Sequence, residues 1–160
     1  MRDAFHQKLL DWIAARSIMC EHLVFERSTH SVAEAAATAG ATAQDFIKSI
    51  CWLNVEGRMA VSIVRGDDRV ERSAVQALAG LGKLRIAAPE DVLRHTGYPA
   101  GGTPPFGFEA CFLVDERVME AARVYGGGGS DHALIRIAPA EMLRANCGQV
   151  AVLRRLASPG

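Results

Sequence analysis

Hydrophobic and polar positions recur along this 160-residue chain with two different periods. Between residues 3 and 16 the apolar side chains return every three or four positions, which predicts an amphipathic helix. Ser31 followed by Glu34 has the spacing of a capping box, and the alanine-rich segment after it predicts a helix that ends at Gly40. Further helices are predicted at residues 42–45 (a single turn), 70–81, 89–97 and, as a last short helix, from residue 139.

Strand signals fill most of the remaining chain. The apolar run at residues 46–55 predicts a strand, Glu56-Gly57 a turn, and residues 59–64 the partner strand. Residues 98–107 hold too many prolines and glycines for a regular element, and the four glycines at 126–129 predict a tight loop. Shorter strands are predicted at residues 21–26, 84–87, 111–115, 123–125, 133–137 and 149–153.

Helices and strands follow one another without the strict alternation of βαβ units. The order therefore predicts an α+β fold, with a mixed, strongly curved, barrel-like sheet flanked by helices. A chain of this length fits one domain. We expect that domain to span residues 1–160, with the N-terminal helix of residues 1–18 packed on it.

Composition narrows the class of protein. Hydrophobic residues make up 49% of the chain and charged residues 22%, as in ordinary globular proteins. No apolar stretch approaches the roughly 20 residues of a membrane span. The N-terminus carries Asp3 and lacks the apolar core of a signal peptide. We therefore expect a cytoplasmic protein without a membrane partner.

Charge and cysteine spacing exclude several kinds of chemistry. The formal net charge is zero, so any contact with nucleic acid is expected to be local. The four cysteines form no C-x-x-C pair and none lies beside a histidine at metal spacing, which favours reduced thiols and no metal site. No phosphate-binding loop, dinucleotide fingerprint, G-x-S-x-G or H-E-x-x-H is present, and we expect no cofactor.

Lys48 is the most informative single residue. In a strand, Phe46, Lys48 and Ile50 point to one face and Ser49 to the other. A lysine among apolar neighbours loses hydration, which is costly unless an anion or a ligand oxygen compensates. The alternative is a lysine that extends to solvent or pairs with a buried carboxylate. The residues alone leave both interpretations open.

Two glycine-rich segments are candidates for close backbone contact with a ligand. Residues 101–107 combine glycines with two prolines that hold the loop rigid. Residues 126–129 could turn backbone N–H groups toward an oxyanion. Such a segment is more often only a turn. If the first loop presents its backbone to a substrate, Gly101→Ala should block the substrate without unfolding the protein.

Other reactive side chains have weaker support. Cys51 as a nucleophile would need a nearby base, and the spacing of the five histidines, among them His30 and His132, reveals none. Asp115 ends an apolar strand, where it could orient Lys48 or a water, but an acid at a strand end is equally ordinary.

Two segments resemble the YbaK/EbsC family of aminoacyl-tRNA deacylases. Residues 44–50, Q-D-F-I-K-S-I, are similar to the family's Q-I-V-K-S-L strand with its functional lysine. Residues 101–107, G-G-T-P-P-F-G, are similar to its G-G-V-P-P-F-G loop. Several shorter matches follow in the family's order, at residues 66–70, 81–82, 88–92, 96–98, 114–115, 128–129 and 139–143. The lysine strand and the glycine–proline loop, in this order and spacing, carry the resemblance.

The resemblance implies a compact α+β enzyme that hydrolyses the ester of a mischarged tRNA, often a tRNA for proline carrying a small wrong amino acid. Its partners would be the acceptor end of aminoacyl-tRNA and, as a further possibility, prolyl-tRNA synthetase. It implies catalytic roles for Lys48, Gly101 and Gly129. The substrate-binding residues that it implies are His30, Phe46, Ser49, Gly102, Thr103, Pro105, Asp115, Gly128 and His132.

Two departures concern the family's amino-acid pocket. Gly126-Gly127 leave one loop unusually bare, and Ser130-Asp131-His132 differ from the family's commoner residues, so the amino acid removed stays open. An aminoacyl ester is already activated, so the enzyme needs no nucleophile of its own. Two other functions also stay open: a catalytically silent module that binds tRNA or a synthetase, and a hydrolase of another activated acyl ester.

Overall fold

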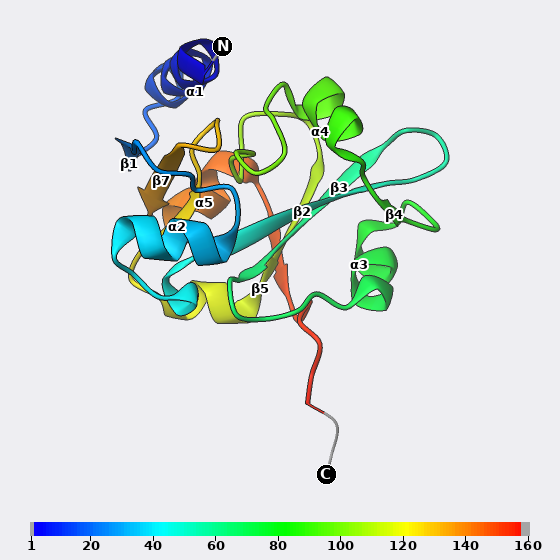
Figure 1. The fold of residues 1–160 in the computed structure, drawn as a ribbon. Helices are drawn as coiled ribbons and strands as arrows, with labels where there is room; N and C mark the ends of the chain where they lie inside the picture. The colour runs from blue at the N-terminus through cyan, green and yellow to red at the C-terminus, as the bar shows by residue number, and fades with distance from the viewer. Residues whose placement is uncertain (1, 158–160) are drawn as a thin grey trace.

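The structure, a computed structural model, describes residues 2–157. Its described helices are α1 (Arg2–Ala15), α2 (Val32–Ala39), α3 (Arg72–Ala79), α4 (Pro89–Thr96) and α5 (Pro139–Asn146), with 3-10 helices η1 (Ala43–Asp45) and η2 (Glu116–Glu120). Its described strands are β1 (Cys20–Val24), β2 (Ile47–Leu53), β3 (Met59–Arg65), β4 (Arg85–Ile86), β5 (Cys111–Asp115), β6 (Val124–Gly127), β7 (Ala133–Ile137) and β8 (Gln149–Ala151). Figure 1 shows their arrangement.

The described strands form two sheets. The larger sheet has the order β4-β2-β3-β5-β8, and the smaller sheet the order β1-β7-β6. β2 and β3 form an antiparallel hairpin, whereas β5 runs parallel to both β3 and β8. The larger sheet is therefore mixed, as expected. Among the described residues, the two sheets are joined by backbone pairing at one bridge, between Phe46 and Tyr125, so one closed, barrel-like sheet is not confirmed.

The predicted elements are present with small shifts at their ends. Ser31 Oγ accepts a hydrogen bond from the Glu34 N–H at 3.1 Å, and α2 ends at Gly40 with φ of 68°. The predicted single turn is η1, whose Asp45 carboxylate accepts from the Thr42 N–H at 2.9 Å. The strand expected at 46–55 ends instead at Leu53, because Asn54 turns the chain by accepting the Arg58 N–H at 2.8 Å.

The prediction of one loop over the four glycines is wrong for its first half. Gly126 and Gly127 belong to β6, where they pair with Ile135 and Leu134 of β7. A Cβ on Gly127 would lie 2.1 Å from the Thr103 carbonyl oxygen, whereas a Cβ on Gly126 would lie 3.1 Å from the Ile47 side chain. Gly127 therefore allows the loop of residues 98–107 to pack directly on a strand.

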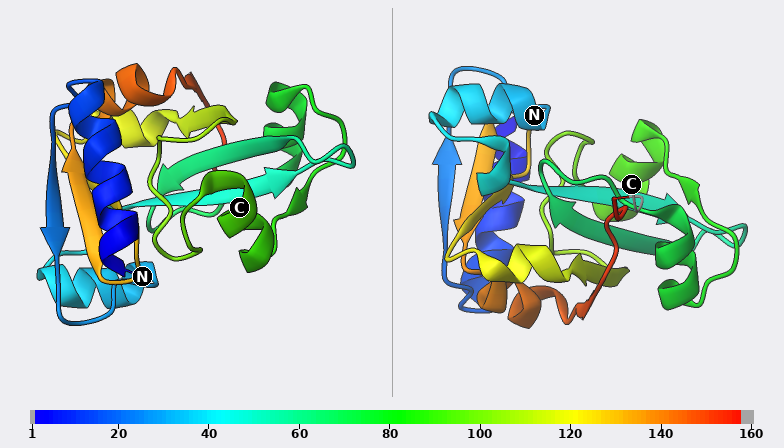
Figure 2. Two further views of the ribbon diagram at one scale, coloured as in Figure 1. Left: turned by 90° about the horizontal axis from the view of Figure 1, so that it is seen from above. Right: turned by 90° about the horizontal axis from the view of Figure 1, so that it is seen from below.

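Two hydrophobic clusters hold the layers together. The larger one joins α1, the smaller sheet and one face of the larger sheet, with Leu9, Ile63 and Phe106 among its fully buried members. The second lies under α3 on the opposite face and centres on Trp52. Figure 2 shows α1 lying along the smaller sheet, with the larger sheet extending away from it. No helix of the described residues is long and apolar enough to cross a membrane.

Candidate functional site

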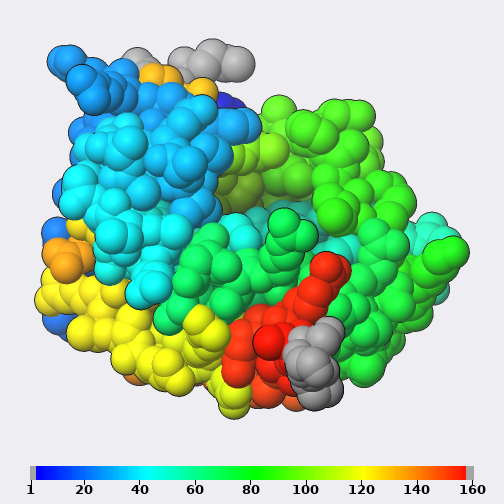
Figure 3. Space-filling view, turned by 60° about the horizontal axis from the view of Figure 1, so that its bottom comes forward, coloured from blue at the N-terminus to red at the C-terminus, as the bar shows by residue number. Residues whose placement is uncertain are grey.

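A cavity of about 460 Å³ opens where the two sheets meet. Its lining comes from five segments: residues 29–35, 46–51, 86–92, 100–103 and 126–134. Figure 3 shows the molecule hollowed between α2, in blue to cyan, and the green segments around α4 and residues 98–107. Among the described residues that line it, Lys48 and His30 have basic side chains and none has a carboxylate. The cavity is thus suited to a ligand that carries oxygen atoms or negative charge.

The cavity lies along an open edge of strand β2. β4 pairs with β2 only at Trp52 and Leu53, and no described strand pairs with the same edge between Lys48 and Ile50. Residues from both faces of β2 therefore line the cavity, Lys48 from one face and Ser49 from the other. A ligand here can reach the backbone of the strand as well as its side chains.

Lys48 keeps a positive charge at the cavity wall without a carboxylate partner. Its side chain is half-buried, and Nζ donates a hydrogen bond to the backbone carbonyl of Asp68. Among the described residues it forms no ion pair. Burial lowers the pKa of Lys48, while the nearby carboxylates of Asp68 and Asp67 oppose that shift. The pairing with a buried carboxylate that the sequence left open is therefore not found.

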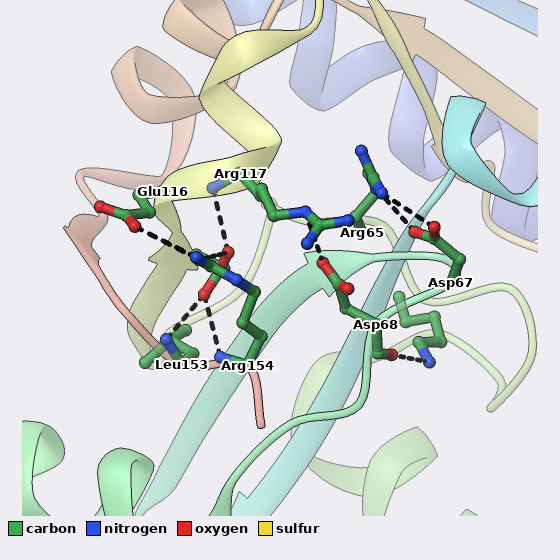
Figure 4. A network of polar contacts seen from close by, with 9 residues as sticks. Arg65, Asp67, Asp68, Glu116, Arg117, Leu153 and Arg154 are labelled. Atoms are coloured by element: carbon green, nitrogen blue, oxygen red, sulfur yellow. Dashed lines mark hydrogen bonds and ion pairs between the residues drawn. The ribbon is translucent and has the colours of Figure 1, made fainter. Parts of the chain in front are cut away.

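Two arginines engage the acids that lie closest to Lys48. Arg65 contacts Asp67 through two hydrogen bonds of 2.6 and 2.9 Å. Arg117 Nε lies 3.3 Å from Asp68 Oδ2, as Figure 4 shows. The hydrogen bond from Arg65 is the main reason that the pKa of Asp67 lies below its usual value. The acids are thus held by other cations, and among the described residues the Lys48 ammonium keeps only its hydrogen bond to the Asp68 carbonyl.

Gly101 and His30 lie in direct contact in the cavity wall. A Cβ on Gly101 would lie 2.2 Å from His30 Nδ1, and the residue has φ of 84°, in the left-handed region that favours glycine. Both residues line the cavity, as expected. The backbone angle changes the expectation for Gly101→Ala, because an alanine there strains the fold whether or not a substrate is present.

Gly128 and Gly129 lie behind the cavity wall. The N–H of Gly129 donates to the Gly102 carbonyl at 2.7 Å, and that of Gly128 to the Ala133 carbonyl at 3.0 Å. Neither residue lines the cavity. Both N–H groups are therefore occupied, and the structure does not offer them to an oxyanion. Gly102, also outside the lining, donates its N–H to the Pro99 carbonyl at 3.0 Å.

Asp115 is linked to Lys48 only indirectly. The Arg117 N–H donates to the Asp115 carboxylate, and the Arg117 side chain contacts Asp68, whose backbone carbonyl accepts from Lys48. The fully buried carboxylate of Asp115 accepts the N–H groups of Leu153, Arg154 and Arg117 at 2.7, 2.9 and 3.0 Å, and the Arg154 guanidinium at 3.0 Å. Burial alone would raise the pKa of Asp115, but these hydrogen bonds outweigh it and lower the pKa. The carboxylate anchors the C-terminal segment through Leu153 and Arg154, which Figure 4 labels.

Some of the remaining predicted residues line the cavity and others lie outside it. Phe46, Ser49 and Thr103 line the cavity, with Phe46 stacked on Tyr125 at 5.0 Å between ring centroids. Pro105 and His132 do not line it. The Pro105 carbonyl accepts from the Asn146 side chain at 3.0 Å, and His132 pairs with the neighbouring carboxylate of Asp131.

Sequence reasoning missed the partners that surround Lys48. Asp68 contributes a backbone carbonyl, and Arg117 contributes a side chain from η2 that holds the Asp68 carboxylate. The first could have been suspected from the match of residues 66–70 to the family pattern. The second has no local signal, because 49 positions separate Asp68 from Arg117 in the chain. Cys51 also lines the cavity, where burial raises the pKa of its thiol to about 12.

Known proteins are similar to this chain over most of its length. The model of the aminoacyl-tRNA editing domain family matches residues 26–145. The uncharacterized protein YwhH of Bacillus subtilis is 27% identical over 120 residues, which cover 74% of this chain and 76% of that protein. A proline–tRNA ligase of Trichlorobacter lovleyi is 29% identical over 80 residues, half of this chain but only 14% of the ligase.

A solved structure also matches this chain in its fold. The crystal structure of a protein described as a candidate trans-editing enzyme for prolyl-tRNA synthetase superposes with a TM-score of 0.86. It is 29% identical in sequence, and the match covers 95% of this chain and 98% of that protein. Both chains therefore share nearly their whole length.

Proposed function

Because this chain belongs to the aminoacyl-tRNA editing domain family, as the match over residues 26–145 shows, we propose that it is a trans-editing deacylase. It would hydrolyse the ester of a mischarged tRNA, most simply a tRNA for proline that carries a small wrong amino acid. The observation that carries the proposal is Lys48, an ammonium without a carboxylate partner at the wall of a cavity lined by no acid.

The cavity can perform this reaction without a protein nucleophile. An aminoacyl ester is already activated, so the site must hold the ester and place a water or a substrate group for attack. Lys48 supplies positive charge for the ester carbonyl, as negative charge develops on its oxygen, or for the phosphate of the terminal nucleotide. The thiol of Cys51, with a pKa near 12, stays protonated at neutral pH and is a poor nucleophile.

The open edge of β2 and the segment at Gly101, which has no side chain, would contact the substrate through backbone atoms. Such contacts limit the space for the amino-acid side chain, which is how a site can select small substrates. His30, Phe46, Ser49 and Thr103 complete our assignment of residues that face the substrate. We place the reaction in the cytoplasm, where tRNAs are charged.

The partner is the acceptor end of the aminoacyl-tRNA, and prolyl-tRNA synthetase is the enzyme whose errors it would correct. With a net charge of zero, the chain offers few phosphate contacts, about two to four. Binding of uncharged tRNA should therefore weaken about 10- to 100-fold between 50 and 200 mM salt, against the ~10³–10⁵-fold loss of a binder with six to ten phosphate contacts. A steep salt dependence would reveal a large basic footprint and contradict this view of the interface.

A panel of mischarged tRNAs tests the function directly. A tRNA for proline charged with alanine, serine, cysteine or proline would be incubated with the protein, and release of the amino acid measured. We expect hydrolysis of at least one small non-cognate ester and sparing of the prolyl ester. Free amino-acid esters serve as the comparison, because equal activity on them would indicate a general ester hydrolase. Binding of tRNA without hydrolysis of any ester would indicate a silent binding module.

A further inference from the structure

The wall of the cavity at residues 100–103 is made largely of backbone, and backbone supports it from behind. A Cβ on Gly102 would lie 2.6 Å from the backbone of Ser130, so these two segments already touch. The hydrogen bond from Gly129 N–H to the Gly102 carbonyl, 2.7 Å long, ties them together. The position of the wall is thus set by the position of the turn at residues 127–130.

Two histidines from the N-terminal segment hold that turn. His6 Nε2 of α1 lies 2.7 Å from Ser130 Oγ, and both side chains are buried, with 7% and 2% of their surface exposed. His22 Nε2 of β1 donates to the Gly128 carbonyl at 2.8 Å. The two imidazole rings meet edge to face, 5.1 Å apart. The turn is therefore fixed to α1 and β1 by side chains as well as by packing.

The Ser130 hydroxyl completes this arrangement. Its oxygen accepts the His132 N–H at 3.1 Å and also shares a hydrogen bond with His6 Nε2, so the hydroxyl joins His6 to the turn. Such a chain of bonds holds the turn in one conformation, because each group has a partner with fixed geometry. His6 and His22 lie before residue 26, where the match to the editing-domain family begins.

We propose that His6 and His22 are positioning residues for the deacylation site. They hold the turn at residues 127–130 and, through it, the wall at residues 100–103 against which the ester lies. This inference rests on the proposed deacylase function. A wall made of backbone has no long side chains that could adjust to a shift, and a displacement near 1 Å at a reacting centre can cost about 100-fold in rate.

The test compares three variants of α1. His6→Leu removes the hydrogen bond to Ser130 and keeps an apolar side chain in place, whereas His6→Gln keeps an amide that can bond to Ser130. Ile13→Val is the matched control, because Ile13 is a buried core residue of the same helix, seven positions along the chain from His6. Single-turnover hydrolysis would be measured against enzyme concentration, with the ester of the panel that the wild type hydrolyses fastest, and melting temperature on the same samples.

For His6→Leu we expect the limiting rate to fall at least about 10-fold, while the enzyme concentration that gives half of that rate changes less than about twofold. His6→Gln should recover most of the rate. Ile13→Val should lower the melting temperature and leave the rate at 20 °C unchanged. A His6→Leu rate within twofold of the wild type would overturn the proposal, as would a loss of rate that Ile13→Val reproduces at equal stability. Should His6→Leu fail to fold, His22→Leu and His6→Gln decide the same question.

A second measurement does not depend on activity. Amide hydrogen exchange at Gly129 reports on its bond to the Gly102 carbonyl, and we expect it to be about 10-fold faster in His6→Leu than in Ile13→Val. Equal exchange in the two variants would overturn the positioning role. Absence of hydrolysis by the wild type on the whole panel would instead refute the deacylase function, and the exchange result would still decide whether His6 holds the wall.

Discussion

Lys48 and Asp115 are both charged residues on strands of the larger sheet, yet their surroundings are opposite. Asp115 is fully buried and accepts four hydrogen bonds, one of them from a guanidinium. Lys48 is half-buried, and the hydrogen bond that it donates goes to a neutral carbonyl. The two residues show how one sheet can use a charge for stability at one place and leave it available at another.

The difference follows from what each charge loses on burial. A buried carboxylate is tolerated when hydrogen bonds replace its hydration, and Asp115 has that replacement within the fold. Lys48 loses part of its hydration to burial, which lowers its pKa, and the carboxylates of Asp68 and Asp67 offset this only in part. A group that the fold itself does not compensate is a candidate for compensation by a ligand. A substitution of Lys48 should therefore lower activity and leave stability nearly unchanged, whereas a substitution of Asp115 should lower stability and leave activity nearly unchanged.

The largest effect is expected for Lys48→Ala. Loss of a charge that contacts the transition state typically costs about 10²–10³-fold in rate, and hydrolysis of the preferred mischarged tRNA should fall by that factor. The melting temperature should change little, because no ion pair is broken. Lys83→Ala is the control, since Lys83 is an exposed lysine outside the cavity lining and should leave the rate unchanged. Near wild-type turnover by Lys48→Ala would remove Lys48 from the site.

The opposite outcome is expected for Asp115→Asn. Removal of one partner from a buried pair costs about 3–5 kcal/mol, and the lower end applies because Arg154 keeps 17% of its side-chain surface exposed. Denaturant unfolding would measure the loss, and deacylation at low temperature should be retained. Glu116→Gln is the matched control: Glu116 also contacts Arg154, at 3.3 Å, but it is exposed. Its loss should cost less than about 1 kcal/mol. Equal costs would show that the buried network is not what stabilises the segment.

The pH dependence of stability sharpens this result. The pKa of Asp115 is lower in the folded protein than its unfolded value of about 3.9. Its contribution is therefore complete well above pH 4 and disappears as the pH falls through the folded pKa. The difference in unfolding free energy between wild type and Asp115→Asn should shrink as the pH is lowered from 5 toward 2. A difference that stays constant over this range would contradict the assigned charge state.

Gly101→Ala combines both kinds of effect at a smaller magnitude. The left-handed backbone should cost about 1 kcal/mol or more of stability, and the added methyl group must displace the ring of His30. The double variant Gly101→Ala/His30→Ala removes the collision and keeps the strained backbone. Thermal melting should therefore show a loss that persists in the double variant, while any recovery of hydrolysis would be due to removal of the collision with the His30 ring. Full recovery of stability would mean that the backbone angle carries no cost.

Local patterns in the sequence determined the secondary structure and the main candidate residue. The capped helix after Ser31, the hairpin of β2 and β3, and the proline-led helices α4 and α5 all carry signals within a few positions. Lys48 stood out because a lysine in an apolar strand has few explanations. Turn chemistry and periodicity act over short distances, so they can be read from neighbouring residues.

The errors arose where distant segments meet. Gly126 and Gly127 are strand residues because they pair with β7, and the loop near Thr103 packs against Gly127; a row of glycines does not show what approaches it. Gly128 and Gly129 have N–H groups that could face a ligand or another backbone segment, and only the fold decides that they bond to Ala133 and Gly102.

Asp115 gives the clearest division between sequence and structure. Its type and its place at the end of an apolar strand could be read from the chain, and both fit a site residue as well as an anchor. Its partners Arg154 and Leu153 lie nearly 40 positions away, and their arrival fixes its role. Sequence thus determined which groups are present and which strand or helix carries them. Tertiary structure decided which charges form ion pairs within the protein, as Asp115 does, and which, like Lys48, line the cavity without one among the described residues, where we propose that a ligand binds.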